Sequence, residues 1–260
     1  MSIKNYFSKL IFTAKISNSP KSWISFIINS KRYSSKFKKG NLNLKNNETF
    51  VYHNKISREK FDLYLRTFKG DIDIFYEVFW KKTYFDHLKF LKDDLKIIVD
   101  LGAHIGMTSI YLSLRFPEAK IYAVEASLDN FELLLKNTSS FKNIVCINAA
   151  AYFEDGFVNF SNDDLSYNQR ISETGVSTKA ISIGSLKENF GLTNIDLMKI
   201  DIEGGEIDLL SKNNSWLSSV NSIIIEIHHP YSLADLQNDV QPYGFIITHN
   251  EDSVLSAIKN

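Results

Sequence analysis

Carboxylate and imidazole side chains follow the ends of two apolar segments in this sequence of 260 residues. Asp201 comes directly after the segment at 196–200, and His228 comes directly after the segment at 222–227. Side chains of these types often accept a proton from a reacting hydroxyl group in enzymes. Asp201 and His228 are therefore the predicted catalytic residues.

A loop with two glycines follows another apolar segment, within the stretch IVDLGAHIGMTS at 98–109. Gly102 and Gly106 permit tight turns and let the backbone approach a ligand closely. Glu125, an acid about twenty residues further on, is placed to accept hydrogen bonds from the hydroxyl groups of a ribose. The loop and the acid together predict a cofactor that contains adenosine.

The spacing of the glycines separates the classes of nucleotide cofactor. Nicotinamide-binding loops have the pattern G-x-G-x-x-G, whereas this loop reads G-A-H-I-G, with His104 where the middle glycine would stand. No Walker lysine follows the loop, which argues against ATP. A nicotinamide oxidoreductase is the disfavoured alternative.

These residues need a common scaffold to bring them together. The sequence alternates apolar, β-branched segments with amphipathic helical patterns, which predicts an α/β fold with a doubly wound parallel sheet. In such sheets ligands bind outside the carboxyl ends of the strands, where the residues named above stand. The expected strands are 97–101, 120–124, 144–148, 196–200 and 222–227, and the expected helices are 106–115, 128–138 and 204–212.

Further elements are expected on both sides of this alternation. Paired strands are predicted at 49–65 and one long helix at 71–91, with an acid near its start as a cap. A strand pair around a polar loop is predicted between 152 and 186, in place of a crossover helix. A terminal hairpin with its turn at 250–252 adds an antiparallel strand to the sheet.

The amino-terminal part of the chain differs in charge from the rest. The first fifty residues contain ten Lys and Arg but only one acid, Glu48, although the whole chain has no formal net charge. We expect a basic amphipathic helical extension at 1–48, with a linker at 30–47, and a catalytic domain at 49–260. The extension either pads the domain, mediates a homodimer, or lies on an anionic membrane through residues 1–45. A nucleic-acid partner is not expected, because the body is acidic.

Cysteine content and hydropathy bear on the compartment. The one cysteine, Cys146, lies in the apolar stretch NIVCIN and is expected to be buried. A chain with a single cysteine suits a reducing compartment. No apolar stretch reaches the about 20 residues that span a bilayer, and no secretory signal is recognised. We expect a cytoplasmic protein, with peripheral attachment to the inner face of the membrane as an alternative.

Several segments together resemble the FkbM family of S-adenosylmethionine (SAM)-dependent methyltransferases, part of the class I methyltransferase superfamily. The resemblance extends over roughly residues 63 to 250, and the block KIDIEGGE, at the right distance from the glycine loop, makes it specific. The family usually has Asn at the position of His104 and Pro at that of Ala126. The matching segments are VDLGAHIGMTSIYL, IYAVEAS, INAAAY, IDLMKIDIEGGEIDLL and SIIIEIHH.

The resemblance implies a seven-stranded, mostly parallel, Rossmann-like sheet that binds SAM. By position, Gly102 and Gly106 approach the methionine end of SAM, Glu125 binds the ribose hydroxyls, and Asp100 stabilises the loop. His104 offers a backbone amide, or its side chain bonds the methionine portion. The residues that flank the adenine are Asn148, Ala149 and Ala150.

The resemblance also implies transfer of a methyl group from SAM to an oxygen atom. We expect the acceptor to be a hydroxyl of a small molecule or glycan, such as a sugar in a surface polysaccharide or secondary metabolite. The alternative is a non-catalytic SAM-binding adaptor in a glycan-assembly complex. Asp201, Glu203, Glu226 and His228 could together bind Mg²⁺, but their spacing is not diagnostic and no metal ligand is assigned. Lys199 is expected to pair with a neighbouring acid.

Overall fold

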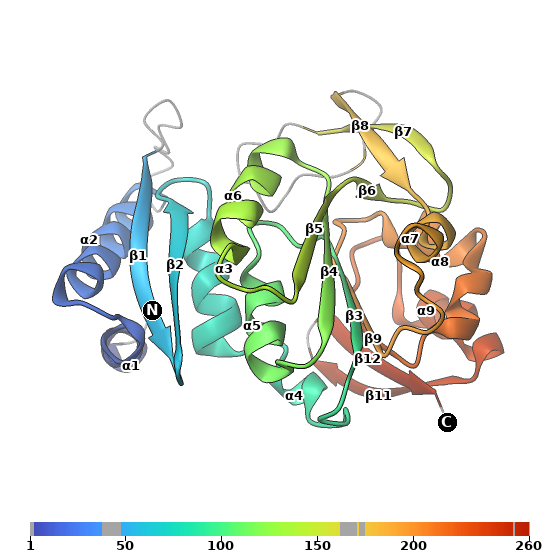
Figure 1. Cartoon of the computed structure of the whole chain (residues 1–260), viewed down its shortest axis with the longest axis horizontal. Coiled ribbons are helices and arrows are strands. Elements are labelled where there is room, and N and C mark those ends of the chain that lie inside the picture. The colour runs from blue at the N-terminus through green and yellow to red at the C-terminus, as the bar shows by residue number, and fades with distance from the viewer. Residues whose placement is uncertain (1–2, 38–47, 162–170, 172–174, 252, 260) are drawn as a thin grey trace.

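The protein is described by a computed structural model that covers residues 3–37, 48–161, 171, 175–251 and 253–259. A seven-stranded sheet lies at its centre, in the strand order β11-β12-β10-β9-β3-β4-β5 (Figure 1). This is the predicted α/β architecture. The strands are β3 (Ile97–Leu101), β4 (Lys120–Glu125), β5 (Ile144–Asn148), β9 (Leu197–Ile200), β10 (Ser222–Glu226), β11 (Phe245–Glu251) and β12 (Val254–Lys259).

Strand directions give the sheet a switch point in its middle. From β10 to β5 all neighbours are parallel. The chain runs outward from β3 through β4 and β5, and then returns to continue on the other side with β9 and β10. Strand β12 is antiparallel to both of its neighbours, which confirms the predicted terminal hairpin. Asp252, within the predicted turn, lies outside the described residues.

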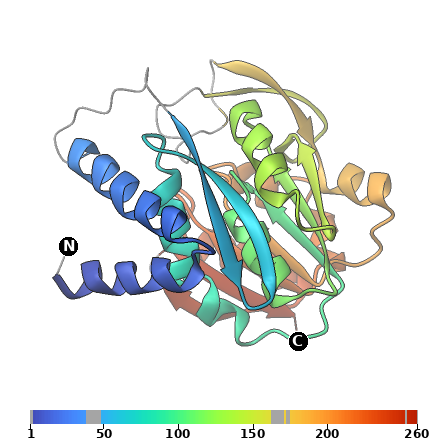
Figure 2. The same ribbon diagram turned by 60° about the vertical axis from the view of Figure 1, so that its left-hand side comes forward.

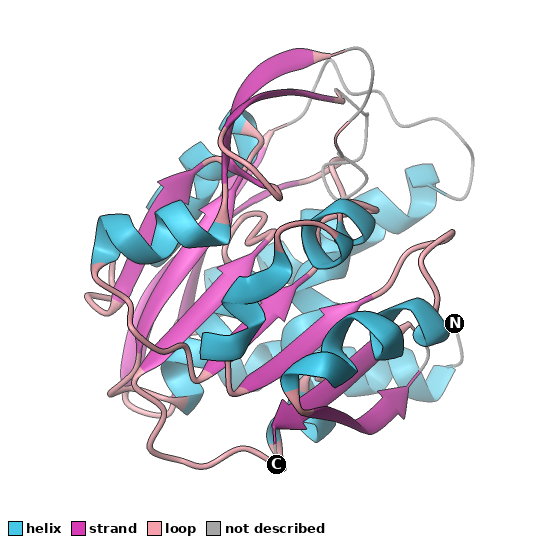
Figure 3. Cartoon of the chain, turned by 90° about the vertical axis from the view of Figure 1, so that its right-hand side faces the viewer, coloured by secondary structure: helices cyan, strands magenta, loops and turns pink. Residues whose placement is uncertain are grey.

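Helices cover both faces of this sheet, and each face has its own apolar core (Figure 3). Successive residues of β3 alternate between the two cores, since Ile98 belongs to one and Val99 to the other. One face carries α5 (Met107–Arg115) and α6 (Leu128–Thr138); the other carries α7 (Ile183–Phe190), α8 (Glu206–Ser211) and α9 (Leu233–Val240).

Two of these helices are not among the predicted elements. Helix α7 begins after Ser182, whose hydroxyl accepts a hydrogen bond from the Ser185 amide, so the strand expected through Leu186 ends earlier. Helix α9 begins with a capping box formed by Ser232 and Asp235. Both helices have only eight residues, which is too short for a clear apolar periodicity. The N-capping serines, Ser182 and Ser232, are therefore the stronger sequence signal for these helices.

The expected strand pair after β5 is present as part of a small separate sheet. It contains β6 (Ala150–Ala151), β7 (Gly156–Phe160) and β8 (Val176–Ile181). Most of the polar loop between β7 and β8 lies outside the described residues. Cys146 is only partly buried, contrary to expectation, because β5 is the edge strand of the main sheet.

The amino-terminal helices pack on a two-stranded hairpin beside the main sheet (Figure 2). The hairpin consists of β1 (Thr49–Ile56) and β2 (Glu59–Arg66), and the helices are α1 (Ile3–Ile16) and α2 (Pro20–Phe37). The linker expected from residue 30 therefore begins as helix, and residues 38–47 lie outside the described part. No described helix has the length and apolar character needed to traverse a bilayer.

An aromatic stack joins these helices to the rest of the protein. The ring of Phe26 stacks on Tyr52 and Phe75, with centroid distances of 4.1 and 4.8 Å. Phe26 and Ile98 of the central sheet belong to the same core cluster. The proposed domain boundary after residue 48 stays a prediction, but apolar packing is continuous across it.

The single helix expected at 71–91 is divided into three short pieces. These are α3 (Asp71–Phe75), the π-helical turn η2 (Tyr76–Lys81) and α4 (Phe85–Leu88). The backbone turns at Lys82, which has a φ of 60°. Asp71 does not cap the helix, because its carboxylate accepts three hydrogen bonds from Arg66, at 2.8, 2.9 and 2.9 Å.

We predict that Phe26→Ala lowers the free energy of unfolding by about 3–5 kcal/mol, because it leaves a cavity between two stacked rings. The matched control is Phe7→Ala on α1, since Phe7 is 58% exposed whereas Phe26 is 0% exposed. Urea unfolding of both variants measures the difference. Equal losses would show that the aromatic stack does not stabilise the fold.

Candidate active site

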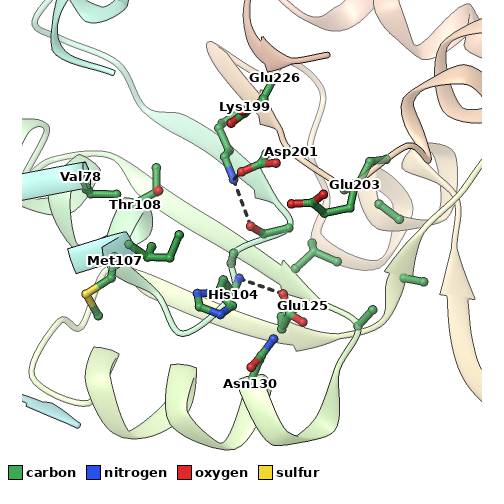
Figure 4. A pocket seen from close by; sticks show the side chains of 18 of the residues that line it. Val78, His104, Met107, Thr108, Glu125, Asn130, Lys199, Asp201, Glu203 and Glu226 are labelled. Carbon is green, nitrogen blue, oxygen red and sulfur yellow. Dashed lines mark hydrogen bonds and ion pairs between the residues drawn. The ribbon is translucent and has the colours of Figure 1, made fainter. Parts of the chain in front are cut away.

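A cavity of about 330 Å³ lies at the carboxyl ends of β3, β4 and β9, beside the switch point of the sheet (Figure 4). Its lining changes in character from one side of the switch point to the other. Small apolar residues follow β3, β4 and β5, and carboxylates come from α3, η2 and the ends of β9 and β10. The apolar set is Ala103, Ala126, Ala149, Ala150 and Ala151; the acidic set is Asp73, Glu77, Asp201, Glu203 and Glu226.

The first glycine of the loop is required by close packing. Gly102 has a φ of 74°, and a Cβ atom there would lie 1.7 Å from the carbonyl oxygen of Asp201. The loop after β3 can therefore lie against the end of β9 only with glycine at this position. Gly102 also lines the cavity, where SAM binding was predicted.

The second glycine serves a different contact. Gly106 has a φ of 91°, and a Cβ atom there would lie 2.8 Å from Cδ1 of Leu134 on α6. It stands at the start of α5 and is not among the residues that line the cavity. In this structure Gly106 allows two helices to pack closely, and its predicted contact with SAM stays a prediction.

A buried lysine joins the ends of β3 and β9. The Lys199 ammonium lies 3.3 Å from a carboxylate oxygen of Asp100 and 3.3 Å from one of Asp201, and it donates to the Gly102 carbonyl oxygen at 3.0 Å. Asp100 also accepts a hydrogen bond from Ser109 at 2.6 Å. Burial favours a lower pKa for Lys199, but the Asp201 and Asp100 carboxylates outweigh it and raise the pKa above its ordinary value. Lys199 therefore stays charged and stabilises the loop together with Asp100.

Glu125 lies at the end of β4 with its carboxylate at the cavity. Its oxygens accept hydrogen bonds from the backbone amides of His104, at 2.8 Å, and Ser127, at 2.9 Å. Burial raises the pKa of Glu125, and these two amide bonds oppose the rise. The Asn130 side chain bonds to the same carboxylate. Because a carboxylate has about four acceptor positions, Glu125 retains capacity for a further donor, and its predicted bond to the ribose stays a prediction.

His104 takes a backbone conformation that few non-glycine residues adopt. Its φ is 51°, which turns its amide toward Glu125. Its ring faces the cavity, with Nε2 4.0 Å from the Asp71 carboxylate. Burial lowers the pKa of His104 to about 4, so the ring is neutral at physiological pH. Of the two roles considered for His104, the backbone amide is therefore used to bond Glu125 in this structure.

The residues predicted to flank the adenine lie in two different places. Ala149 and Ala150 line the cavity. Asn148 is not among the lining residues, and its side-chain amide donates to the carbonyl oxygens of Glu125 and Ala126, at 2.9 and 3.3 Å. Asn148 therefore braces the end of β4 and positions the Glu125 backbone.

The acidic side of the cavity centres on Asp201. The hydroxyl of Tyr84 donates to Asp201 at 3.5 Å, and Ser253 donates to Glu226 at 2.8 Å. Burial, with the Asp201 carboxylate as the next cause, raises the pKa of Glu203 to about 7 and also raises that of Glu226. Several carboxylates thus share a small volume, and Glu203 has a pKa close to neutral.

His228 is not among the residues that line the cavity and is held by two glutamates. Its Nδ1 is 3.0 Å from Glu206, and its Nε2 is 3.5 Å from Glu203. Burial alone would lower the pKa of His228, but the hydrogen bond and charge of Glu206 and the charge of Glu203 raise it to about 9. Glu206 is fully buried and also accepts the Ile202 amide at 3.2 Å. Glu206 therefore braces the loop after β9.

Three of the residues considered for Mg²⁺ come together. One ligand atom from each of Asp201, Glu203 and His228 lies within 4.8 Å of the others, and Glu226 is not part of this group. Carboxylates and imidazole are ligand types that divalent cations accept. In this structure both ring nitrogens of His228 lie against glutamates, Nδ1 against Glu206 and Nε2 against Glu203, and we derive no step through a metal.

Several lining residues were not expected from the sequence. Asp73, Glu77 and Tyr84 reach the cavity from α3, η2 and the turn before α4. The sequence carries one signal for them, the spacing of four between Asp73 and Glu77 on a single helical face. Nothing in the sequence indicated which part of the sheet that face would meet.

Comparison with known proteins gives the family. The model of the methyltransferase FkbM domain matches residues 100–246. The chain belongs to this family. The match includes the glycine loop and the ends of β4, β9 and β10, whereas the wall of the FkbM cavity formed by residues 73–84 lies outside it.

Two proteins of similar sequence are named as methyltransferases. Hexuronic acid methyltransferase AglP of Haloferax volcanii is 27% identical over 136 residues, which are 51% of this chain and 56% of AglP. Methyltransferase sdnD of Sordaria araneosa is 25% identical over 194 residues, with 59% of this chain and 74% of sdnD covered. The chain thus matches little more than half the length of AglP. A methyltransferase FkbM structure from Methylobacillus flagellatus KT has a TM-score of 0.49 and 18% identity, with 67% of this chain and 46% of that chain covered.

We predict that Gly102→Ala destabilises the FkbM domain far more than Gly191→Ala. Both glycines have positive φ, 74° and 64°, so both variants incur about 1–2 kcal/mol of backbone strain. Only the Cβ at 102 meets a carbonyl oxygen, whereas nothing lies within 4 Å at 191. Urea unfolding should show an additional loss on the order of 4 kcal/mol at 102. Equal losses would contradict the packing described here.

A second prediction concerns the histidines. We expect His228 to titrate near pH 9 and His104 near pH 4 in NMR spectra of the folded protein. Because the folded pKa of His228 is raised, its contribution to stability is present below about pH 6.5 and is lost as the pH rises through 9. Glu206→Gln should lower the His228 midpoint, since it removes the bonded carboxylate. A titration midpoint of His228 near pH 6.5 in the unaltered protein would contradict its placement between Glu206 and Glu203.

Proposed function

We propose that this chain is a SAM-dependent O-methyltransferase that acts on a hydroxyl of an uncharged or amine-bearing sugar. The observation that supports this most is the cavity of the FkbM domain, which combines the glycine loop and Glu125 with an acidic side around Asp201.

The donor side suits SAM in shape and chemistry. Glu125 has hydrogen-bonding capacity for the ribose hydroxyls, and Ala149 and Ala150 leave room for a flat adenine. Gly102 has no side chain, so the methionine portion of SAM could lie close to the backbone at this position. When bound, SAM supplies a methyl group on a sulfonium centre that is already activated for displacement.

The acceptor side orients a hydroxyl and receives its proton. Lys199 and Tyr84 both contact the Asp201 carboxylate, at 3.3 and 3.5 Å, and so fix its direction. Orientation of two reactants can contribute about 7–11 kcal/mol to catalysis, and a general base about 10²–10⁴-fold. We assign the orienting and proton-accepting role to Asp201.

The contacts of His228 and Glu203 favour a positioning role for His228 and a proton-accepting role for Glu203. His228 carries its proton up to about pH 9, so at neutral pH it is a poor base, and we propose that it positions Glu203. Glu203 has a pKa of about 7, which is suited to proton transfer at neutral pH. It is a second candidate for receiving the acceptor proton after Asp201.

The charge of the lining limits the class of acceptor. Six described lining residues are acidic, and the one lysine or arginine among them, Lys199, is paired with Asp201 and Asp100. Burial raises the pKa values of the other five lining acids, so their repulsion of an anion is strongest at a pH above those raised values. Two like charges about 6 Å apart repel by about 3 kcal/mol at an effective dielectric constant of about 20. We therefore propose that an acceptor with a carboxylate, such as the hexuronic acid in the name of AglP, is disfavoured here.

The alternative is a SAM-binding adaptor without transfer activity. An adaptor has no need of an oriented carboxylate beside the donor site, whereas Asp201 is held by two neighbours. The enzyme is therefore the better supported of the two functions.

The test offers labelled SAM and three matched acceptors: a methyl hexoside, the corresponding hexosaminide and the corresponding hexuronide. We expect label in the first two and at least about tenfold less in the hexuronide. Asp201→Asn should lose about 10²–10⁴-fold in transfer at saturating SAM, while circular dichroism shows a folded protein and calorimetry still detects binding of S-adenosylhomocysteine. The control is Asp208→Asn, since Asp208 contacts Tyr152 and Lys212 and is not a lining residue.

Each outcome bears on a different part of the proposal. Preference for the hexuronide would overturn the acceptor class and leave methyl transfer intact. Absence of S-adenosylhomocysteine binding would overturn the donor. Binding without transfer to these acceptors or to glycan extracts would favour the adaptor.

A further inference from the structure

The two amino-terminal helices expose large apolar side chains in a regular arrangement. On α1, Phe7 and Ile11 are each 58% exposed, and on α2, Ile24 and Ile28 are 50% and 51% exposed. The members of each pair are four residues apart and therefore share one side of their helix. Each helix thus presents a short apolar stripe to its surroundings.

Lysines continue both stripes at either end. Lys4 and Lys15 stand three and four residues beyond the pair on α1, and Lys21 and Lys31 stand three residues beyond the pair on α2. All four lysines are exposed. We call these eight residues the basic apolar face: Lys4, Phe7, Ile11, Lys15, Lys21, Ile24, Ile28 and Lys31.

Among the described residues, this face is not covered by the rest of the fold. The opposite sides of the helices bury Thr13, Ile16, Phe26 and Asn29, and the helices cover the outer side of the β1–β2 hairpin (Figure 2). Trp23 of α2 donates to the Leu10 carbonyl oxygen of α1 at 3.2 Å and fixes one helix on the other. The exposed apolar side chains therefore add little to the described core, and their grouping into stripes indicates an interaction surface.

We propose that the basic apolar face binds the surface of an anionic lipid bilayer. Apolar side chains bracketed by lysines on an amphipathic helix enter the boundary between head groups and acyl chains, while the lysine stems extend toward the phosphates. No acid occurs before Glu48, so nothing on these helices repels an anionic surface. Each basic residue near such a surface contributes about 1 kcal/mol of attraction.

Charge also distinguishes this partner from two others. A second copy of the chain would bring lysines against lysines, because the face contains four of them and no acid. A nucleic acid would meet the lysines but would leave Phe7, Ile11, Ile24 and Ile28 without an apolar environment. A bilayer surface satisfies both kinds of side chain at once.

The face is firmly connected to the active site. Ser30 of α2 bonds to the Tyr76 hydroxyl at 3.0 Å, Trp80 donates to Ser8 of α1 at 3.1 Å, and the Lys9 ammonium lies 4.1 Å from the centre of the Tyr76 ring. These contacts are made by η2, the same turn from which Glu77 lines the cavity. Membrane binding would therefore hold the cavity at a fixed orientation to the lipid surface.

The test is cosedimentation of the full-length protein with vesicles of phosphatidylcholine alone or with one-third phosphatidylglycerol. We expect binding only to the anionic vesicles, and loss of that binding as the salt concentration rises. Phe7→Ala combined with Ile11→Ala should weaken it at least about tenfold. The matched control is Phe157→Ala, since Phe157 is 78% exposed on β7, away from the face.

A second set of variants tests the charges. Lys4→Gln, Lys15→Gln and Lys21→Gln together should weaken binding at least about tenfold, whereas the same change at the exposed Lys55, Lys60 and Lys142 should not. Circular dichroism confirms that each variant is folded. Methyl transfer to a soluble acceptor should be unchanged in all of them, which separates this proposal from the proposed function.

Four results would overturn the proposal. The first is no binding to anionic vesicles, and the second is binding that these variants leave unchanged. The third is a dimer that Phe7→Ala with Ile11→Ala converts to a monomer in analytical ultracentrifugation, because the face would then be a contact between copies. Binding to an oligonucleotide without binding to vesicles would likewise exclude a lipid surface.

Discussion

The buried ammonium group of Lys199 is the interaction on which the active-site edge of the sheet depends. It contacts carboxylates at the ends of two neighbouring strands, Asp100 and Asp201, and the carbonyl oxygen of Gly102 between them. The same loop lies so close to β9 that Gly102 has no room for a side chain. Removal of one partner of such a buried pair typically costs about 3–5 kcal/mol, since it leaves a charge without compensation. The glycine loop and the Asp201 carboxylate are therefore parts of one electrostatic unit.

Much of the fold was predictable from the sequence because its signals are local. Buried parallel strands consist of short β-branched segments, and all five predicted ones are present, within two residues of their expected ends. The helices α7 and α9 were missed because eight residues show little periodicity, although Ser182 and Ser232 announce them as caps. The break of the predicted helix at 71–91 depends on Lys82 and on packing against the sheet, which a pattern of apolar residues does not contain.

The candidate site was predictable in part, because some of its residues belong to local sequence motifs. The order of motifs indicated Gly102, Glu125 and Asp201, and all three line one cavity. The sequence could not show that Gly106 faces α6 or that His228 is enclosed by Glu203 and Glu206, because these are contacts between distant segments. The charge state of a histidine depends on such contacts more than on its neighbours in sequence.

The cavity wall at 73–84 lies outside the matched FkbM domain, whereas the glycine loop and the carboxylates after β9 and β10 lie inside it. Asp73 and Glu77 line this wall from α3 and η2, and Tyr84 at its far end bonds to Asp201. Under the proposed function, a change at Asp73 or Glu77 would alter the acceptor side alone, whereas a change at Tyr84 would also reach the carboxylate that Lys199 holds. Homologues can thus differ in part of the cavity wall while the glycine loop is retained.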